Sequence, residues 1–461
     1  MPALSHKRQS AEPLMPASDK ADVLDSPTAA PPRHSQASTG AKSTVPDKPT
    51  TRSSTLRVAV AMGVALAVLA LVWAGRRPMS SMIVAPPLAV LPPARLSSEA
   101  PLILRRGRVL PQHGRPTNSQ HASTLVEAAP GEVIAAWFGG KWERVNGTSI
   151  WMARFTYDAA QPEAGAWGPA HRVAKDPGGG PLWNPVLFKD SLTGHITLFY
   201  KSGKNEKLWV GWRKVSKDGG RTWGRAKRLG HGLLGPAKNK PLQLPDGTIL
   251  APASDESGTE WPKWTAHLEA SQDHGVTWVR RAEVLYEGDV IQGSLFVGKD
   301  GNVRMLLRLR DRAVENNHYV NGRVVLAIGD AHGTRWVSVA PTGLPNPNSG
   351  LDAVMLRDGR LLTVLNPTTD TGGTRGPSRA TLSIVMSDTD GQSWKSVTDL
   401  ERVASSPDGK HWPTYSYPAI IQTSDGLVHV SYTYTEHVTI KPRVGRENIM
   451  HVVLNASSII S

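Results

Sequence analysis

Two stretches of the chain, SKDGGRTW at 216–223 and SQDHGVTW at 271–278, share the pattern Ser-x-Asp-x-Gly-x-Thr-Trp. A degenerate copy, SDTDGQSW, occupies 387–394, and a variant, DAHGTRW, occupies 330–336. In such a stretch the Asp side chain can hydrogen-bond the backbone of its own turn, Gly accepts a positive φ, and Trp anchors the turn on an apolar layer. We therefore expect these Asp residues to have a structural role and not a catalytic one.

The tryptophans of these turns recur at a nearly constant spacing. The intervals are 56, 55, 58 and 58 residues along the series Trp167, Trp223, Trp278, Trp336 and Trp394. Self-similarity at such a period is typical of an array of supersecondary units.

A second periodic feature gives the number of units. Short apolar runs meet at a turn six times, at 130–131, 193–194, 246–247, 300–301, 358–359 and 425–426, and the last four turns are Asp-Gly. Asp-Gly between two such runs is a strong hairpin signal. Six units over 101–455 predict an all-β fold, a six-bladed β-propeller with four strands in each blade. We expect residues 102–104 to pair with the last strand near 450–454 and close the ring.

The N-terminal part of the chain does not fit the repeat. Residues 1–56 are rich in Pro, Ser, Ala and Thr, which predicts a disordered tail. Residues 58–75 contain no charged residue and would form a helix of roughly 27 Å, enough to cross a bilayer. The flanking Lys and Arg slightly favour a cytosolic N-terminus. We therefore predict a transmembrane signal anchor at 57–75, a Pro-rich linker at 76–100 and a propeller outside the cytosol, periplasmic or extracellular.

Two other readings of this apolar stretch remain open. One is a signal peptide cleaved after Ala74, which would give a secreted protein, although the leader ahead of it is long. The other is a helix buried in a soluble fold.

Composition excludes several classes of site. Cysteine is absent, so thiol nucleophiles, disulfides, iron–sulfur clusters and Cys-ligated zinc are excluded. The formal net charge is +14, but no run of Lys and Arg is longer than two, which argues against nucleic-acid binding. We expect no metal and no cofactor. A basic surface or an acidic substrate accounts for the charge.

The repeat also predicts where a site would lie. In a propeller the innermost strands start at one face around the axis, so side chains there should surround one pocket. The second strands return to that face and end near Glu143, Lys201, Asp255/Glu256, Arg308/Arg310 and Asn366. Arg can grip a carboxylate with two parallel hydrogen bonds, so such a pocket suits an anionic ligand. The six positions that open the first strands are His121, Asn184, Lys240, Gln292, Asp352 and Tyr417.

The repeated turns resemble the Asp boxes of the sialidase (neuraminidase) family. Further stretches typical of its BNR-repeat branch are HASTLVEAAPGEVIAAWFGG (121–140), LWNPVLF (182–188), GPAKNKP (235–241), LPNPNSGLDAV (344–354) and YSYPAIIQTSDGLVHVSYT (415–433). The resemblance covers roughly 100–455. It implies a sialidase-fold propeller acting on the terminal sialic acid of glycoconjugates.

The resemblance implies roles for three residues. Tyr417, eight residues before Asp425, stands where the family has its tyrosine nucleophile, with Tyr415 as a competitor. Arg308, at the end of the second strand of the fourth blade, matches one substrate-binding arginine of the family. Arg379, eight residues before Ser387, matches another.

Two positions depart from the family pattern. His121 is found where the family has its first arginine, and Gln292 is found where it has the glutamate that activates the tyrosine. Glutamine cannot accept a proton, and a free phenol has a pKa of about 10, so another base is needed. Glu143 or Asn146 lies nearest to the expected acid/base position. We expect partial burial to raise the pKa of Glu143 so that it can protonate the leaving oxygen, with Asp352 and His121 as alternatives for proton transfer.

Three hypotheses follow for the function. The first is a retaining exo-glycosidase that removes a terminal sialic acid through Tyr417, an exception to the two-carboxylate rule. Arg308 and Arg379 would hold the substrate carboxylate, with His121 and Lys240 as helpers. The second is a hydrolase of the same fold for another acidic glycan, and the third is a non-catalytic carbohydrate-binding propeller. A carboxylate within hydrogen-bond reach of Tyr417 would favour an enzyme, whereas amide neighbours alone would favour a binding module.

Overall fold

The computed structural model describes residues 91–256, 264–310, 314–315, 318–319, 322–368, 377–403, 413–436, 439–440 and 443–460. They belong to one compact unit, Val84–Ser461. The predicted tail at 1–56 and the predicted anchor at 57–75 lie outside the described residues. Within the described part, no helix is long and apolar enough to span a bilayer.

Six antiparallel sheets form the six blades, which confirms the predicted all-β propeller. Blade 1 consists of β3 (Ser119–Ala129), β4 (Glu132–Gly140), β5 (Ser149–Asp158) and β6 (Gln161–Trp167), with β7 (His171–Ala174) paired to β5. Blade 2 consists of β8 (Leu182–Lys189), β9 (Ile196–Ser202), β10 (Val210–Ser216) and β11 (Lys227–Arg228). Blade 3 consists of β12 (Leu242–Gln243), β13 (Ile249–Asp255), β14 (Thr265–Ser271) and β15 (Val279–Glu283). Blade 4 consists of β16 (Asp289–Val297), β17 (Val303–Arg310), β20 (Arg323–Gly329) and β21 (Trp336–Pro345). Blade 5 consists of β22 (Asp352–Met355), β23 (Leu361–Leu365), β24 (Thr381–Ser387) and β25 (Lys395–Arg402).

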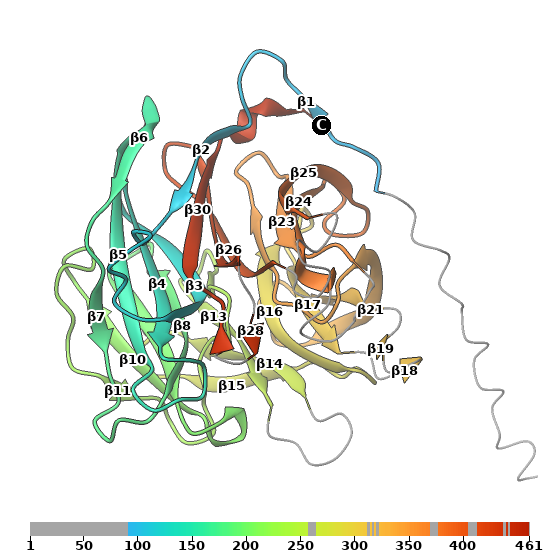
Figure 1. Ribbon diagram of the computed structural model, residues 1–461. Coiled ribbons are helices and arrows are strands. Elements are labelled where there is room, and N and C mark those ends of the chain that lie inside the picture. Colours follow the sequence, from blue (N-terminus) through green and yellow to red (C-terminus); the bar gives the residue numbers. More distant parts are fainter. Residues whose placement is uncertain are drawn as a thin grey trace, which may run out of the picture. The chain divides into compact units, whose positions relative to one another are not determined.

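The sixth blade combines both ends of the propeller sequence. It consists of β26 (Thr414–Gln422), β27 (Val428–Thr435), β30 (Asn448–Leu454) and, at its outer edge, β2 (Ile103–Arg108). The register from Ile103 opposite Leu454 to Arg108 opposite Met450 confirms the predicted closure of the ring. Innermost strands contact each other between blades 1 and 2, 4 and 5, 5 and 6, and 6 and 1, and Figure 1 shows β3, β8, β16 and β26 around the middle.

Short elements complete the described fold. They are the strand pairs β1 (Arg95–Leu96) with β31 (Ile459–Ile460), β18 (Val314–Glu315) with β19 (His318–Tyr319) and β28 (Thr439–Ile440) with β29 (Arg443–Val444), and the 3-10 turns η1 (Glu206–Leu208), η3 (Pro377–Arg379) and η4 (Ala456–Ser458).

The end of the predicted linker is hydrogen-bonded to blade 5. Ala94 N donates to Ser396 O at 2.7 Å, and Ser396 N donates to Pro92 O at 2.9 Å. From residue 92 onward, the predicted linker is therefore bonded to the propeller.

The repeated Asp-box turns lie between the third and fourth strands of their blades. In the turn after β14, Asp273 Oδ1 accepts hydrogen bonds from Val276 N at 3.0 Å and Thr277 N at 2.8 Å. Ser271 Oγ accepts from Gly275 N at 2.8 Å, and Gly275 has a φ of 80°. Trp278 is 8% exposed and packs on the core. These bonds support the structural role that we expect for this Asp residue.

The innermost strands carry a bulge that positions the site. In blades 1, 2, 4 and 6 the register shifts at a residue with positive φ, which is Ala122, Asn184, Gln292 or Tyr417. The predicted equivalence of His121 with Gln292 and Tyr417 is therefore wrong by one residue. Counted back from the glycine of the hairpin turn, Ala122, Gln292 and Tyr417 share the same spacing, and β3 simply has a small residue there.

The turn after β14 allows a test of this structural role. Replacing Asp273 by Ala should lower the free energy of unfolding at pH 7 by about 1 kcal/mol, because the Val276 and Thr277 amides lose their acceptor. Burial opposes ionisation, but hydrogen bonds from Thr277 and Ser271 outweigh it and lower the pKa of Asp273 to about 2. The carboxylate therefore stabilises the fold above the ordinary Asp pKa of about 4, and this contribution disappears as the pH falls toward 2.

Denaturant unfolding at pH 7 and near pH 2 measures this difference. Gln272→Ala, an exposed neighbour in the same turn, is the control and should change neither value. Equal stability of the Asp273→Ala and parent proteins at pH 7 would contradict the structural role.

Candidate functional site

Tyr417 lies at the bulge of β26 in a strained backbone conformation. Its φ is 55°, although a proline follows it and it is not a glycine. Such strain costs on the order of 1–3 kcal/mol and persists only where neighbouring groups enforce it. The buried Lys238 ammonium donates to Pro418 O at 2.5 Å and lies 5.9 Å from the Tyr417 ring centroid. A Cβ on Gly350 would lie 3.4 Å from the tyrosine ring, so the ring is closely packed.

The Tyr417 hydroxyl is held by two side chains from blade 4. Arg308 Nη1 donates to it at 3.0 Å, and Gln292 Nε2 donates to it at 3.4 Å. Arg308 Nη1 also donates to Gln292 Oε1 at 3.1 Å, and Arg308 Nε donates to Asn348 Oδ1 at 2.7 Å. Arg308 is only 7% exposed. The structure thus brings three sequence-predicted residues, Tyr417, Arg308 and Gln292, into one hydrogen-bonded cluster.

Arg379 joins this cluster from η3. Its Nη2 donates to Asn348 O at 3.3 Å, so Arg308 and Arg379 both bond to Asn348. Burial, followed by the positive charge of Arg308, lowers the pKa of Arg379 to about 10, so it remains charged at neutral pH. The two guanidinium groups in this cluster repel each other, and an anion placed between them would relieve that repulsion.

His121 packs directly on the tyrosine. Their ring centroids are 4.3 Å apart, and His121 Nδ1 is 2.9 Å from Thr433 Oγ1. Burial, and then the charges of Arg446 and Arg379, hold the pKa of His121 well below its usual value. The imidazole is therefore neutral at pH 7 and can hydrogen-bond, but it does not supply the positive charge of a third arginine.

Glu143 forms an ion pair at the edge of this cluster. Its Oε2 accepts from Arg446 Nη1 at 2.7 Å, and the Arg446 guanidinium lies 5.3 Å from the Trp142 ring. Burial raises the pKa of Glu143, but the charge and hydrogen bond of Arg446 outweigh this effect and lower it below the usual value. The expectation of a raised pKa is wrong, because the sequence did not reveal the arginine partner. As an ionised carboxylate, Glu143 is poorly suited to donate a proton.

Asp352 is committed to contacts between blades. Its two oxygens accept from Lys240 Nζ at 3.1 and 3.0 Å, from Ser294 Oγ at 2.8 Å and from Ile420 N at 3.0 Å. The Asp352 residue is only 2% exposed. The geometry favours a structural role for both Asp352 and Lys240 over proton transfer or ligand binding.

The remaining predicted residues lie around the cluster. Asn184 is buried and donates from Nδ2 to Ala237 O at 3.1 Å. Arg310 pairs with Asp289, from Nε to Oδ2 at 2.7 Å, and its guanidinium lies 3.6 Å from the centroid of the Trp264 ring. Tyr415 is 5% exposed and packs in the core of blades 5 and 6, with its ring centroid 5.4 Å from that of Tyr434.

Glu256, directly after β13, is a functional candidate that sequence reasoning did not select. Its Oε1 is buried and has no hydrogen-bond partner among the described residues. Burial raises the pKa of Glu256 to about 7, against a weaker lowering effect of the Arg308 charge. A carboxyl group that titrates near neutrality beside Arg308 can carry a proton. The end of a second strand was the available signal, since this is the face where Glu143 and Arg308 were expected.

The fold and this cluster can now be compared with known proteins. A profile described as BNR repeat-like domain matches residues 131–430. The chain belongs to this BNR repeat-like family. A comparison of this BNR repeat-like chain with curated proteins finds no match.

Solved structures share its fold at low sequence identity. A protein of unknown function from Dyadobacter fermentans is 15% identical with a TM-score of 0.57, covering 77% of this chain and 98% of that chain. Hadza microbial sialidase Hz136 is 17% identical with a TM-score of 0.57, covering 77% and 69%. Trypanosoma rangeli sialidase in complex with sialic acid is 13% identical with a TM-score of 0.53, covering 78% and 59%.

The protonation of Glu256 gives a stability test that needs no substrate. Because its pKa is raised from 4.5 to about 7, the stability linked to the neutral carboxyl is present below pH 4.5 and is lost as the pH rises through 7. Glu256→Gln should therefore match the parent at low pH and exceed its free energy of unfolding at pH 8 by on the order of 2 kcal/mol.

Thermal unfolding from pH 4 to pH 8 follows this difference. Glu163→Gln, an exposed carboxyl on β6, is the control and should run parallel to the parent. A Glu256→Gln protein that also runs parallel to the parent would show that the carboxyl is not buried as described.

Proposed function

We propose that this propeller is an exo-acting glycoside hydrolase that removes a terminal acidic sugar of the sialic acid kind from a glycan. The observation that carries the proposal is the hydrogen bond between the Tyr417 hydroxyl and the buried Arg308, with Arg379 bonded to the same Asn348. The known sialidases of the same fold support the choice of reaction class, whereas the residues of this chain support the choice of an acidic sugar.

The two arginines would bind the substrate carboxylate. Arg308 and Arg379 are linked through Asn348, and Arg379, with a pKa of about 10, remains charged at neutral pH. An anion between them gains two charge-assisted contacts and removes the repulsion between the guanidinium groups. This clamp would fix the anomeric carbon of the sugar near Tyr417.

Tyr417 would attack the anomeric carbon. Its oxygen forms the new bond while the bond to the leaving glycan oxygen breaks, and water later hydrolyses the tyrosyl intermediate. The phenol proton is lost to water, and the charge of Arg308 stabilises the developing phenolate. Glu256 would protonate the leaving oxygen, because a substantial fraction of this carboxyl is neutral at pH 7. Glu143, ionised beside Arg446, would not compete for that role.

A non-catalytic binding propeller is the second candidate, and one observation favours it. Among the described residues, the hydrogen-bond partners of the Tyr417 hydroxyl are Arg308 and Gln292. Neither is a carboxylate that could act as a base, whereas both suit the binding of an anionic sugar. The two candidates therefore differ in turnover and not in affinity.

Turnover of fluorogenic aryl glycosides separates these candidates. The parent should hydrolyse an aryl sialoside, and Tyr417→Phe should reduce kcat by about 10³-fold or more while sialic acid binding is kept, because only the nucleophile is lost. Tyr415→Phe is the control in the same strand and should keep the parent rate. An aryl glucuronide tests a hydrolase of another acidic glycan.

Each alternative outcome has a definite meaning. Hydrolysis of the glucuronide alone would keep the enzyme class and change the sugar. Sialic acid binding without turnover of either substrate would leave the binding propeller. Parent-like turnover by Tyr417→Phe would remove the tyrosine from the reaction.

We also propose that residues 57–75 anchor the protein in a membrane, with the propeller outside the cytosol. The support is the uncharged stretch at 58–75 and its flanking arginines. The full chain should remain in the membrane fraction after alkaline carbonate washing, and a protease added outside the cell should reach the propeller. A soluble exported product beginning after Ala74 would instead indicate a cleaved signal peptide. A soluble, protease-protected full chain would contradict both.

A further inference from the structure

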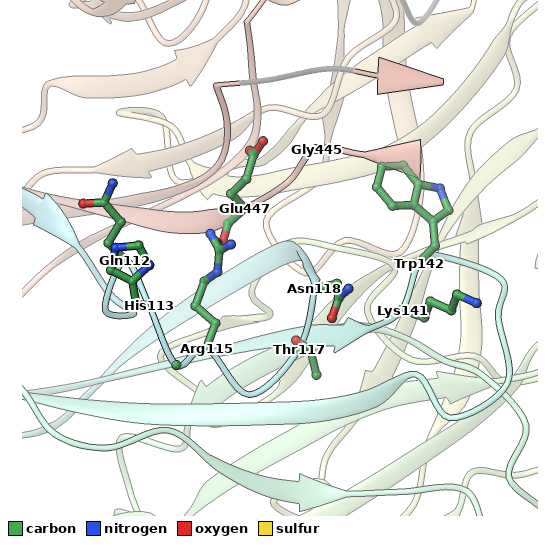
Figure 2. A pocket seen from close by; sticks show the side chains of 10 residues that line it. Gln112, His113, Arg115, Thr117, Asn118, Lys141, Trp142, Gly445 and Glu447 are labelled. Atoms are coloured by element: carbon green, nitrogen blue, oxygen red, sulfur yellow. Dashed lines mark hydrogen bonds between the residues drawn. The ribbon is translucent and has the colours of Figure 1, made fainter. Parts of the chain in front are cut away.

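A pocket lies between blades 6 and 1, and none of its lining residues belongs to the tyrosine cluster. It encloses about 400 Å³ and is formed by residues 112–118, 141–142 and 445–447. Figure 2 shows Arg115 and Glu447 at one side, Trp142 and Lys141 at the other, and Thr117 and Asn118 between them. Its volume is within the range of pockets that hold small ligands.

This pocket adjoins the tyrosine site through a shared ion pair. Arg446, between two residues that line the pocket, donates to Glu143 at 2.7 Å, and its guanidinium lies 5.3 Å from the Trp142 ring. The same Arg446 charge contributes to the lowered pKa values of His121 and Arg379. The ion pair and Trp142 therefore connect the lining of this pocket to the tyrosine cluster.

The walls of the pocket are held in place by the propeller. Thr117 Oγ1 donates to Gln120 Oε1 at 2.6 Å, and Trp137 Nε1 donates to the same oxygen at 3.0 Å. Arg115 Nη1 donates to Glu447 O at 2.9 Å, and Gln120 N donates to Arg446 O at 2.8 Å. These bonds connect two of the three wall segments, 112–118 and 445–447, to β3 and to each other, so little ordering of these two segments is needed on binding.

The chemistry of the lining suits a sugar. Trp142 offers an indole ring, Asn118 an amide, and Arg115 and Lys141 positive charges. Polyhydroxylated rings combine an apolar CH face with hydroxyl groups, and they match a lining in which an aromatic ring is surrounded by donors and acceptors.

From this arrangement we propose that the pocket is a second sugar site, which binds the part of the glycan next to the terminal acidic unit. The inference rests on the proposed function, because it requires that unit to occupy the tyrosine site. The enzyme would then prefer an oligosaccharide to a single acidic sugar. Trp142, Arg115 and Lys141 would set the preference without touching the reacting atoms.

Binding to the full-length Tyr417→Phe protein tests the inference without turnover. The probes are N-acetylneuraminic acid and the trisaccharide 3′-sialyllactose, measured by titration calorimetry. The trisaccharide should bind about 10-fold more tightly than the monosaccharide. Adding Trp142→Ala should abolish most of that gain and leave the monosaccharide affinity unchanged.

A second variant is needed because Trp142→Ala also removes the contact between the Trp142 ring and Arg446. Lys141 is exposed and is part of the pocket wall, so Lys141→Ala should reduce the gain with little effect on folding. Lys217→Ala, an exposed lysine in an Asp-box turn, is the matched control and should keep the whole gain. Circular dichroism verifies that each variant is folded.

The possible failures are distinguishable. Equal affinity for the two probes, or a gain that survives both Trp142→Ala and Lys141→Ala, overturns the second site while the tyrosine site stands. Binding of neither probe removes sialic acid as the substrate of the proposed function, and the second site for its glycan is rejected with it.

Discussion

Three consecutive residues near the propeller axis, Lys238, Asn239 and Lys240, connect four blades. Lys238 donates to Leu351 O at 3.2 Å and to Pro418 O at 2.5 Å, which joins blade 3 to blades 5 and 6. Asn239 Nδ2 donates to Gln292 O and Gly293 O at 3.0 Å, which joins it to blade 4. Lys240 pairs with Asp352. Buried polar groups persist only when they are satisfied, so this segment fixes how the innermost strands face one another.

The same segment explains how the tyrosine is held. Burial lowers the pKa of Lys238 to about 7. Its ammonium group nevertheless donates three hydrogen bonds, to Asn239 Oδ1, Leu351 O and Pro418 O. A positive φ at Tyr417 is costly, and the bond from Lys238 to Pro418 O holds the adjacent peptide in place. The backbone strain at Tyr417 is therefore offset by a hydrogen bond from a lysine of another blade. The contacts that hold the blades together thus also fix the geometry of the site.

Local signals were enough to predict the architecture and part of the cluster. The Asp-box turns and the six hairpins depend on residues a few positions apart, so the sequence displays them directly. Tyr417, Arg308 and Gln292 were found because the repeat fixes their distance from a turn. His121 was grouped with Gln292 and Tyr417 as a polar residue that opens its strand, although the spacing from the turn points to Ala122, which has no side chain that could signal a site.

Interactions between distant segments could not be predicted in this way. Glu143 and Arg446 are separated by 303 residues and meet only because the last blade closes beside the first. That contact reverses the direction expected for the pKa of Glu143. Glu256 was on the expected face, but its raised pKa depends on burial that a repeat pattern does not report.

The chemistry of the cluster follows from its charge balance. Gln292 occupies the position where the family resemblance implied a glutamate, and His121 is neutral, so the tyrosine is surrounded by arginines without an adjacent carboxylate among the described residues. Without a glutamate at position 292 the cluster binds an anion more tightly, because one negative charge fewer repels it. The cluster then also lacks the group that would take the phenol proton. A hydrolase built on this cluster must rely on cationic stabilisation of the phenolate and on a proton carrier placed elsewhere. Glu256 meets the second requirement, because it is close enough to Arg308 to interact with its charge and is not neutralised by a salt bridge of its own among the described residues.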